Sequence, residues 1–437
     1  MNNGNLAAWM LEQEARALLA RLARVKPFAL HETMVPAAAV SPAAQIGIER
    51  FLAAGRRELQ GRVEHYLRWL RSREGRKAPA AEGQRRLAFL RLRFNVALSH
   101  LDLFSDVLTQ RSEHETGVWL SGLDAAAADA LRLPAYYEAP PVICYLDRGV
   151  GAAIRRARTR LPGGGANPVA IVRVPRERMV GSGVASSLFH ETGHQASALL
   201  GLVDSLRPVL QERWREAGGS PTGVWRFWER WISEILADFW SVARVGIAST
   251  LGLMGVVSLP RAFVFRINLD DPHPFPWIRV KISCAVGGAL YPHPQWERLA
   301  GLWESFYPRR GLDPERLELL ARLESEMDEL VSLLVSHRPS ALRGNALPEV
   351  MELEERQPSR LRSCHRAWTQ NPALLYRTRP SVVFAAIGQA RADDAITPED
   401  EGEMISRLLI HWALQSTLSA SAHLKAVEAP RAVAPAT

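Results

Sequence analysis

Cysteine is scarce in this chain of 437 residues, which has only Cys144, Cys284 and Cys364. No two of them form a Cys-x-x-Cys pair, so the sequence does not indicate a zinc site built from thiolates. A low and odd number of cysteines fits a reducing compartment, where disulfides are rare. We therefore expect a cytoplasmic protein.

Lysine is also rare. The chain has four lysines, and arginine supplies the rest of its 54 basic residues and most of its formal charge of +8. The arginines are scattered or in short pairs such as Arg56-Arg57, and they form no long basic run or basic arm. Nucleic acid is therefore not the expected partner, and salt-dependent retention on DNA would test this expectation.

Long hydrophobic runs are missing as well. The longest uncharged apolar run lies between Arg244 and Arg261, and it falls short of the ~20 apolar residues that a membrane-spanning helix needs. We expect a buried core helix there and no membrane span. Leu11, Leu18 and Leu22 recur at helical spacing with charges between them, which predicts an amphipathic helix rather than a signal peptide.

Hydrophobic periodicity predicts an α+β fold that is predominantly helical. Apolar residues between 90 and 108 keep a spacing of three or four, which marks one face of a helix. Residues 142–146 and 169–174 are strand candidates, and prolines on both sides of the second suggest that it lies at a sheet edge. We expect a short helix between these strands and a loop at 73–83.

We expect four regions along the chain. Residues 1–135 form a helical region, 136–300 a zinc domain with a small sheet, 301–426 a second helical region, and 427–437 a disordered tail. In the C-terminal region, Asp313-Pro314 and Thr397-Pro398 are each typical of a helix start, because proline suits the first helical position.

The segment His190-Glu191-Thr192-Gly193-His194 has the spacing of a metal-binding helix. Two histidines four residues apart lie about 40° apart around a helix, with Cβ atoms about 6 Å apart, so both imidazoles can reach one ion. Glu191 lies at the edge of that face, where it can contact a metal-bound water and act as general base. The alternative is a buried, purely structural cluster, in which unpaired polar groups would be costly.

A third ligand is expected from the segment Glu234-Ile235-Leu236-Ala237-Asp238. Two carboxylates one turn apart in an apolar helix repel each other and lose hydration, and a dication relieves both effects. We assign Glu234 as the third ligand of one Zn²⁺ per chain. Asp238 is expected to accept a hydrogen bond from the outer nitrogen of a ligand histidine. The alternative is an acidic pair that faces solvent.

These elements together resemble the gluzincin metallopeptidases, in particular the branch that includes the HtpX heat-shock protease and the membrane proteases that process prenylated proteins. That branch has His-Glu-x-x-His, then Glu-x-x-Ala-Asp, then a His-Pro segment that ends in Arg. Here the third element runs from Asp271 to Arg279. The resemblance covers about residues 165–285, and it implies a zinc peptidase fold with an edge strand near the helix that pairs with an extended substrate. The chain departs from that branch in its helical flanks and its lack of a clear span.

We expect a zinc metallopeptidase that cleaves a peptide or protein substrate. Zinc lowers the pKa of a bound water toward ~7, and Glu191 takes its proton and passes it to the leaving amine. By its position in the resemblance, His273 is the candidate for a second hydrogen-bond donor to the oxyanion, and His293 is the alternative. Arg279 is expected to anchor the same turn through an acidic partner that the sequence does not identify. The competing function is a non-catalytic scaffold stabilised by zinc.

Overall fold

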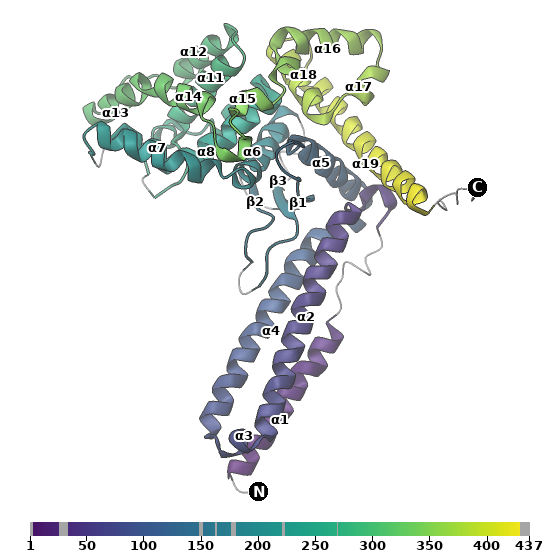
Figure 1. The fold of residues 1–437 in the computed structure, drawn as a ribbon. Coiled ribbons are helices and arrows are strands. Elements are labelled where there is room, and N and C mark those ends of the chain that lie inside the picture. The colour runs from purple at the N-terminus through teal and green to yellow at the C-terminus, as the bar shows by residue number, and fades with distance from the viewer. Residues whose placement is uncertain are drawn as a thin grey trace, which may run out of the picture.

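The computed structural model describes residues 3–25, 34–147, 152–161, 164–175, 181–220, 223–268 and 270–428. Helices dominate and surround one small sheet, so the predicted α+β, predominantly helical fold is confirmed. A long helical stalk projects from a broader body that holds the sheet (Figure 1).

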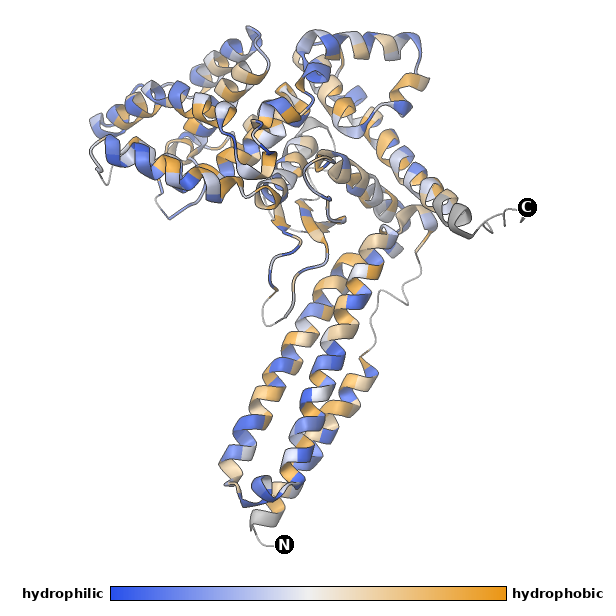
Figure 2. Cartoon of the chain, viewed as in Figure 1, coloured by the Kyte–Doolittle hydropathy of each residue, from blue (hydrophilic) through white to orange (hydrophobic). Residues whose placement is uncertain are grey.

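The stalk consists of α1 (Asn3–Arg24), α2 (Pro42–Arg71) and α4 (Ala80–Thr109), which pack along one another (Figure 1). The predicted amphipathic stripes of α1 and α4 are confirmed. The apolar residues of α1 form one buried cluster with α2 and with Leu90 and Phe94 of α4, and Leu101, Phe104 and Leu108 of α4 belong to a second cluster at the sheet. Figure 2 shows hydrophobic and hydrophilic residues alternating along these helices. The loop expected at 73–83 is wrong: the short α3 (Arg73–Lys77) lies there, capped by the Ser72 side chain, which accepts a hydrogen bond from the Gly75 N–H.

The sheet has the strand order β1-β3-β2, with β1 (Val142–Asp147), β2 (Ala153–Arg155) and β3 (Ala170–Pro175). β1 pairs parallel and β2 antiparallel with β3. Both predicted strands are confirmed, but β3 is central rather than at an edge. Pro168 precedes β3 and Pro175 ends it, so neither proline removes a hydrogen bond from the middle of the strand. β2 replaces the short helix that we expected between the strands.

Each face of the sheet packs against a different part of the molecule. Cys144 and Val172 join the main core, which includes α5 (His114–Ala130) and α6 (Ser182–Leu199). Ile143 and Ile171 point to the other face, where they cluster with Phe104 of α4 and with residues of α2. The sheet thus connects the stalk to the body. α5, which the sequence groups with the N-terminal region, packs in the body against β1 and α19 (Pro398–Glu428).

The centre of the body is formed by α8 (Val224–Val245), α9 (Ile247–Val257) and α11 (Pro276–Leu290). α9 is largely buried, which confirms the expected core helix. Among the described residues, no helix is long and apolar enough to cross a membrane. The other helices of the body are α7 (Leu202–Glu216), α10 (Arg261–Val264), α12 (Gln295–Phe306), α13 (Pro314–Ser325), α14 (Met327–Ser336), α15 (Leu347–Val350), α16 (Pro358–Gln370), α17 (Ala373–Arg377) and α18 (Pro380–Ala392).

Both helix starts predicted in the C-terminal region are confirmed. Asp313 caps α13 by accepting a hydrogen bond from the Arg316 N–H, and α19 begins at Pro398 directly after Thr397. Residues 427–428 belong to the end of α19, and the rest of the expected tail, 429–437, lies outside the described residues.

Candidate metal centre

The site is formed where α6 packs directly against α8. α6 carries His190 and His194, and α8 carries Glu234. Gly193 allows the two helices to approach, because a Cβ at this position would lie only 2.8 Å from the backbone Cα of Ala237. The close crossing brings the polar faces of the two helices together in an otherwise apolar core.

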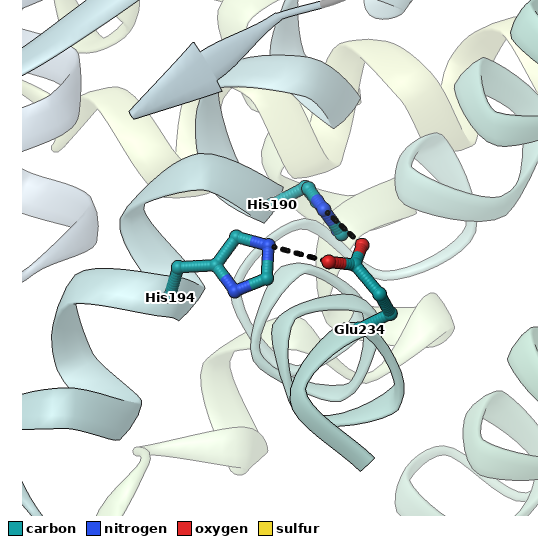
Figure 3. Close-up of side chains that lie close together, drawn as sticks. All are labelled: His190, His194 and Glu234. Atoms are coloured by element: carbon teal, nitrogen blue, oxygen red, sulfur yellow. Dashed lines mark ion pairs between the residues drawn. The ribbon is translucent and has the colours of Figure 1, made fainter. Parts of the chain in front are cut away.

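Glu234 lies between the two histidines (Figure 3). The Nε2 atom of His190 is 3.2 Å from Glu234 Oε2, and the Nε2 atom of His194 is 3.3 Å from Glu234 Oε1. One potential ligand atom from each residue lies within 4.8 Å of the other two. Two imidazoles and one carboxylate form a frequent ligand set of catalytic zinc, which leaves a fourth position for water. These three residues could therefore hold a metal ion.

The burial of Glu234 provides a test of whether the residues fit a cation. The side chain is 7% exposed, and its buried Oε2 atom makes no hydrogen bond of good geometry among the described residues, although the Nε2 atoms of His190 and His273 each lie 3.2 Å away. A buried carboxylate oxygen that lacks a partner is costly. A divalent cation would supply that partner, so the chemistry of the three residues fits a metal.

Asp238 connects His190 to Arg279 of α11. Its Oδ1 lies 2.7 Å from His190 Nδ1, and Arg279 donates to both carboxylate oxygens, at 2.7 and 2.9 Å. An ionised carboxylate only accepts hydrogen bonds, so Nδ1 of His190 carries the proton and Nε2 faces Glu234. The structure thus places Asp238 at the outer nitrogen of His190, and it identifies Asp238 as the acidic partner of Arg279. At 7% and 8% exposure, Glu234 and Asp238 are not a solvent-facing pair.

The ionisable side chains of this cluster shift one another's pKa values. Burial acts to lower the pKa of His190, but Asp238 and Glu234 outweigh it and raise the pKa to about 9. Burial acts to raise the pKa of Glu234, but the two histidines lower it well below its ordinary value. The pKa of Asp238 is lowered in the same way, against the effect of burial, by Arg279 and His190. Glu191 differs, since burial raises its pKa.

Glu191 and His190 both line a cavity of about 150 Å³. The lining residues include His190, Asp238 and Arg279, and Leu253 of α9. A raised pKa suits a general base, because proton transfer is most efficient when the pKa lies near the working pH. A cavity of about 610 Å³ between α2 and α4 contains none of these side chains, so cavity size alone does not mark the site.

His273 reaches the cluster from the loop before α11. Its Nε2 lies 3.2 Å from Glu234 Oε2, and its side chain lines the cavity while remaining 48% exposed. Its Nδ1 lies 2.7 Å from Asp271 Oδ1, and its backbone N–H donates to the same oxygen. His293, the alternative, contacts Arg362 of α16 and is not among the residues that line the cavity.

Two neighbours of the cluster were missed by reasoning from the sequence. Asp271 orients His273, and the signal for it was its position two residues before the histidine. The hydroxyl of Ser233 lies 3.3 Å from His194 Nδ1, and its only sequence signal was its position next to Glu234.

The sheet edge near α6 is β2, and Ala152, directly before β2, lines the cavity.

None of the family models, curated proteins or solved structures with which the chain was compared matches it. The resemblance to gluzincins therefore rests on the residues named above and on nothing else.

Proposed function

We propose that the protein is a zinc-dependent metallopeptidase in which His190, His194 and Glu234 hold the ion. The observation that carries this proposal is the juxtaposition of three potential ligand groups with a cavity that both His190 and Glu191 line. Imidazole together with carboxylate suits zinc among the common divalent metals, and His190 belongs both to the cluster and to the wall of the cavity.

The residues around the cavity have separate tasks in peptide hydrolysis. When bound, zinc would polarise the scissile carbonyl and acidify a water molecule. Glu191 takes the proton of the attacking water on its carboxylate and returns it to the leaving amine. His273, whose Nδ1–H is held by Asp271, would donate from Nε2 to the carbonyl oxygen as the doubly protonated imidazolium, and in this form it stabilises the negative charge that develops there. Asp238 holds the Nδ1 proton of His190 and so directs Nε2 toward the ion.

The second candidate is a non-catalytic scaffold in which the ion is only structural. A structural zinc site is usually closed by four protein ligands and has no need of a base. Here the group found among the described residues has three candidate ligands, and Glu191, which is not one of them, lines a cavity together with His190. This arrangement favours the catalytic proposal.

Cleavage of an unbiased peptide library tests the proposal, with wild type compared with Glu191→Gln. The variant keeps the size and polarity of the side chain but cannot accept the proton, so we expect normal zinc content and at least a ~10²-fold loss in rate. Glu115→Gln is the matched control, because Glu115 also follows a histidine and precedes a threonine but is exposed on α5. Equal cleavage by wild type and Glu191→Gln would overturn the catalytic role, and the zinc content would still report on the metal site.

A further inference from the structure

A second polar site lies on the face of the sheet that meets the stalk. The strand register places six residues on this face, because directly opposed residues and residues two apart share a side. They form two rows, the first with Ile143, Ile171 and Arg155 and the second with Tyr145, Arg173 and Ala153. The helices α2 and α4 cover Ile143 and Ile171. The row that contains Arg173 lies at the edge of the area that these two helices cover, next to Leu103 of α4.

A cavity of about 500 Å³ opens along this second row. Three arginines, Arg155, Arg156 and Arg173, line it together with Tyr145 and Thr159, and none of the described residues that line it is a carboxylate. The Nε atom of Arg173 is buried and has no hydrogen-bond partner within the described part of the chain. The polar wall is thus built from cations and hydroxyl groups.

The nearby carboxylates neutralise this wall only in part. Asp147 Oδ2 lies 3.7 Å from the Nη1 atom of Arg173, which is beyond hydrogen-bonding distance. Asp106 of α4 is near enough to act on the pKa of Tyr145, as Asp147 does. Arg155 and Arg156 have no carboxylate within 4.0 Å among the residues that the structure describes. Among the described residues, the positive charge of Arg155 and Arg156 therefore has no carboxylate partner at the cavity.

We propose that this cavity binds a small phosphorylated ligand through Arg155, Arg156 and Arg173. A guanidinium group presents a planar fork of N–H donors that matches two phosphate oxygens, and charge-assisted hydrogen bonds of this kind are strong. The volume lies in the range of small-molecule sites. The site is separate from the candidate metal centre, since the two cavities have no lining residue in common.

Calorimetric titration of the full chain with inorganic pyrophosphate tests the proposal, at constant ionic strength set with chloride. We expect one site per chain and a loss of about ten-fold or more in affinity for both Arg173→Gln and Arg155→Gln, the scale of one charge-assisted hydrogen bond. Arg57→Gln removes the same charge from an exposed position of α2 and should bind as wild type does. Arg173→Lys keeps the charge but loses the fork, so it should bind with intermediate affinity.

His190→Ala separates this site from the metal centre, because phosphates also bind metal ions. Pyrophosphate should bind to this variant as to wild type, and loss of binding would assign the signal to the metal and overturn the proposal. The proposal also fails if wild type shows no binding at millimolar pyrophosphate, or if Arg57→Gln weakens binding as much as Arg173→Gln does. Binding of heparin or DNA without any binding of pyrophosphate would point to a polyanion partner instead. Circular dichroism of each variant shows that a loss does not come from unfolding.

Discussion

At the level of single residues, Asp238 accepts hydrogen bonds from two directions, from His190 and from Arg279. The Nη2 atom of Arg279 also lies 3.7 Å from Glu234 Oε2, so one guanidinium group lies close to two buried carboxylates. Removal of Asp238 would leave this buried cation without its closest partner and would free the His190 ring to rotate. Asp238 thus contacts one of the candidate metal ligands without itself belonging to the group of three.

Asp238→Ala should weaken zinc affinity by ~10–100-fold, the usual effect of losing a partner that orients a ligand histidine. Competition with a metal-binding dye measures the affinity, and binding should recover at high zinc. Asp204→Ala, at an exposed position of α7, is the control and should leave affinity unchanged. A direct bond between Asp238 and the metal in a crystal structure would contradict the assigned role.

His273→Ala should keep zinc and lower turnover more than it raises the Michaelis constant, because a donor to a developing oxyanion acts in the transition state. The expected loss in kcat is ~10²–10³-fold. His293→Ala is the matched control, since that imidazole also follows a proline but contacts α16. Steady-state kinetics on a peptide found by library cleavage gives both constants. A higher Michaelis constant with unchanged turnover would assign His273 to substrate binding alone.

At the level of elements, the crossing of α6 and α8 depends on Gly193. A Cβ there would lie 2.8 Å from both the Cα and the carbonyl oxygen of Ala237, and backbone atoms cannot move aside as a flexible side chain can. The same helix pair holds all three candidate ligands, so a wider crossing would separate Glu234 from the histidines.

Gly193→Ala should therefore destabilise the fold by about 1–3 kcal/mol, the usual cost of overpacking a core, and reduce zinc affinity together with stability. Gly255→Ala is the control: this exposed position in α9 has nothing within 4 Å of a new Cβ. There the substitution should stabilise by about 0.5–1 kcal/mol, because glycine is unfavourable inside a helix. Denaturant unfolding measures both variants. Equal stability of Gly193→Ala and wild type would show that the crossing tolerates a methyl group.

The elements also show what the sequence could predict. Helix periodicity and caps are local, so α1, α4, α13 and α19 could be read directly from the residues, and so could the two longer strands. The order of the strands is not local, and β2 has only the three residues Ala153–Arg155, too few for an alternating pattern. The pairing of Arg279 with Asp238 joins residues far apart in the chain, and only the packing of α11 on α8 reveals it.

At the level of the whole molecule, the candidate site ties together α6, α8 and the start of α11, while the stalk attaches through the opposite face of the sheet. The stability of the body should therefore depend on the metal. A ligand that binds only the folded chain raises its stability in proportion to the logarithm of its concentration over its dissociation constant.

This metal dependence should change with pH in a defined direction. In the chain without an ion, the folded pKa of His190 is about 9, above its ordinary value of 6.5. A group whose pKa is higher in the folded chain than in the unfolded chain stabilises the fold fully at pH values below its unfolded pKa. This stabilisation is lost as the pH rises through its folded pKa. The lowered pKa values of Glu234 and Asp238 act only at acidic pH, so their contribution stays constant in this window. Zinc needs the neutral imidazole, so its affinity rises as the proton leaves.

We therefore expect the unfolding temperature of the chelator-treated protein to fall between pH 6.5 and about 9, the window set by His190. Over the same range, the increase in unfolding temperature on adding zinc should grow. Differential scanning calorimetry at several pH values, with zinc or with chelator, measures both trends. His190→Ala lacks both the titrating imidazole and one candidate ligand. In this variant, zinc should raise the unfolding temperature far less than in wild type, and without zinc the unfolding temperature should fall less between pH 6.5 and about 9. A zinc effect that is equal at pH 6.5 and pH 9, or that survives intact in His190→Ala, would place the ion elsewhere in the molecule.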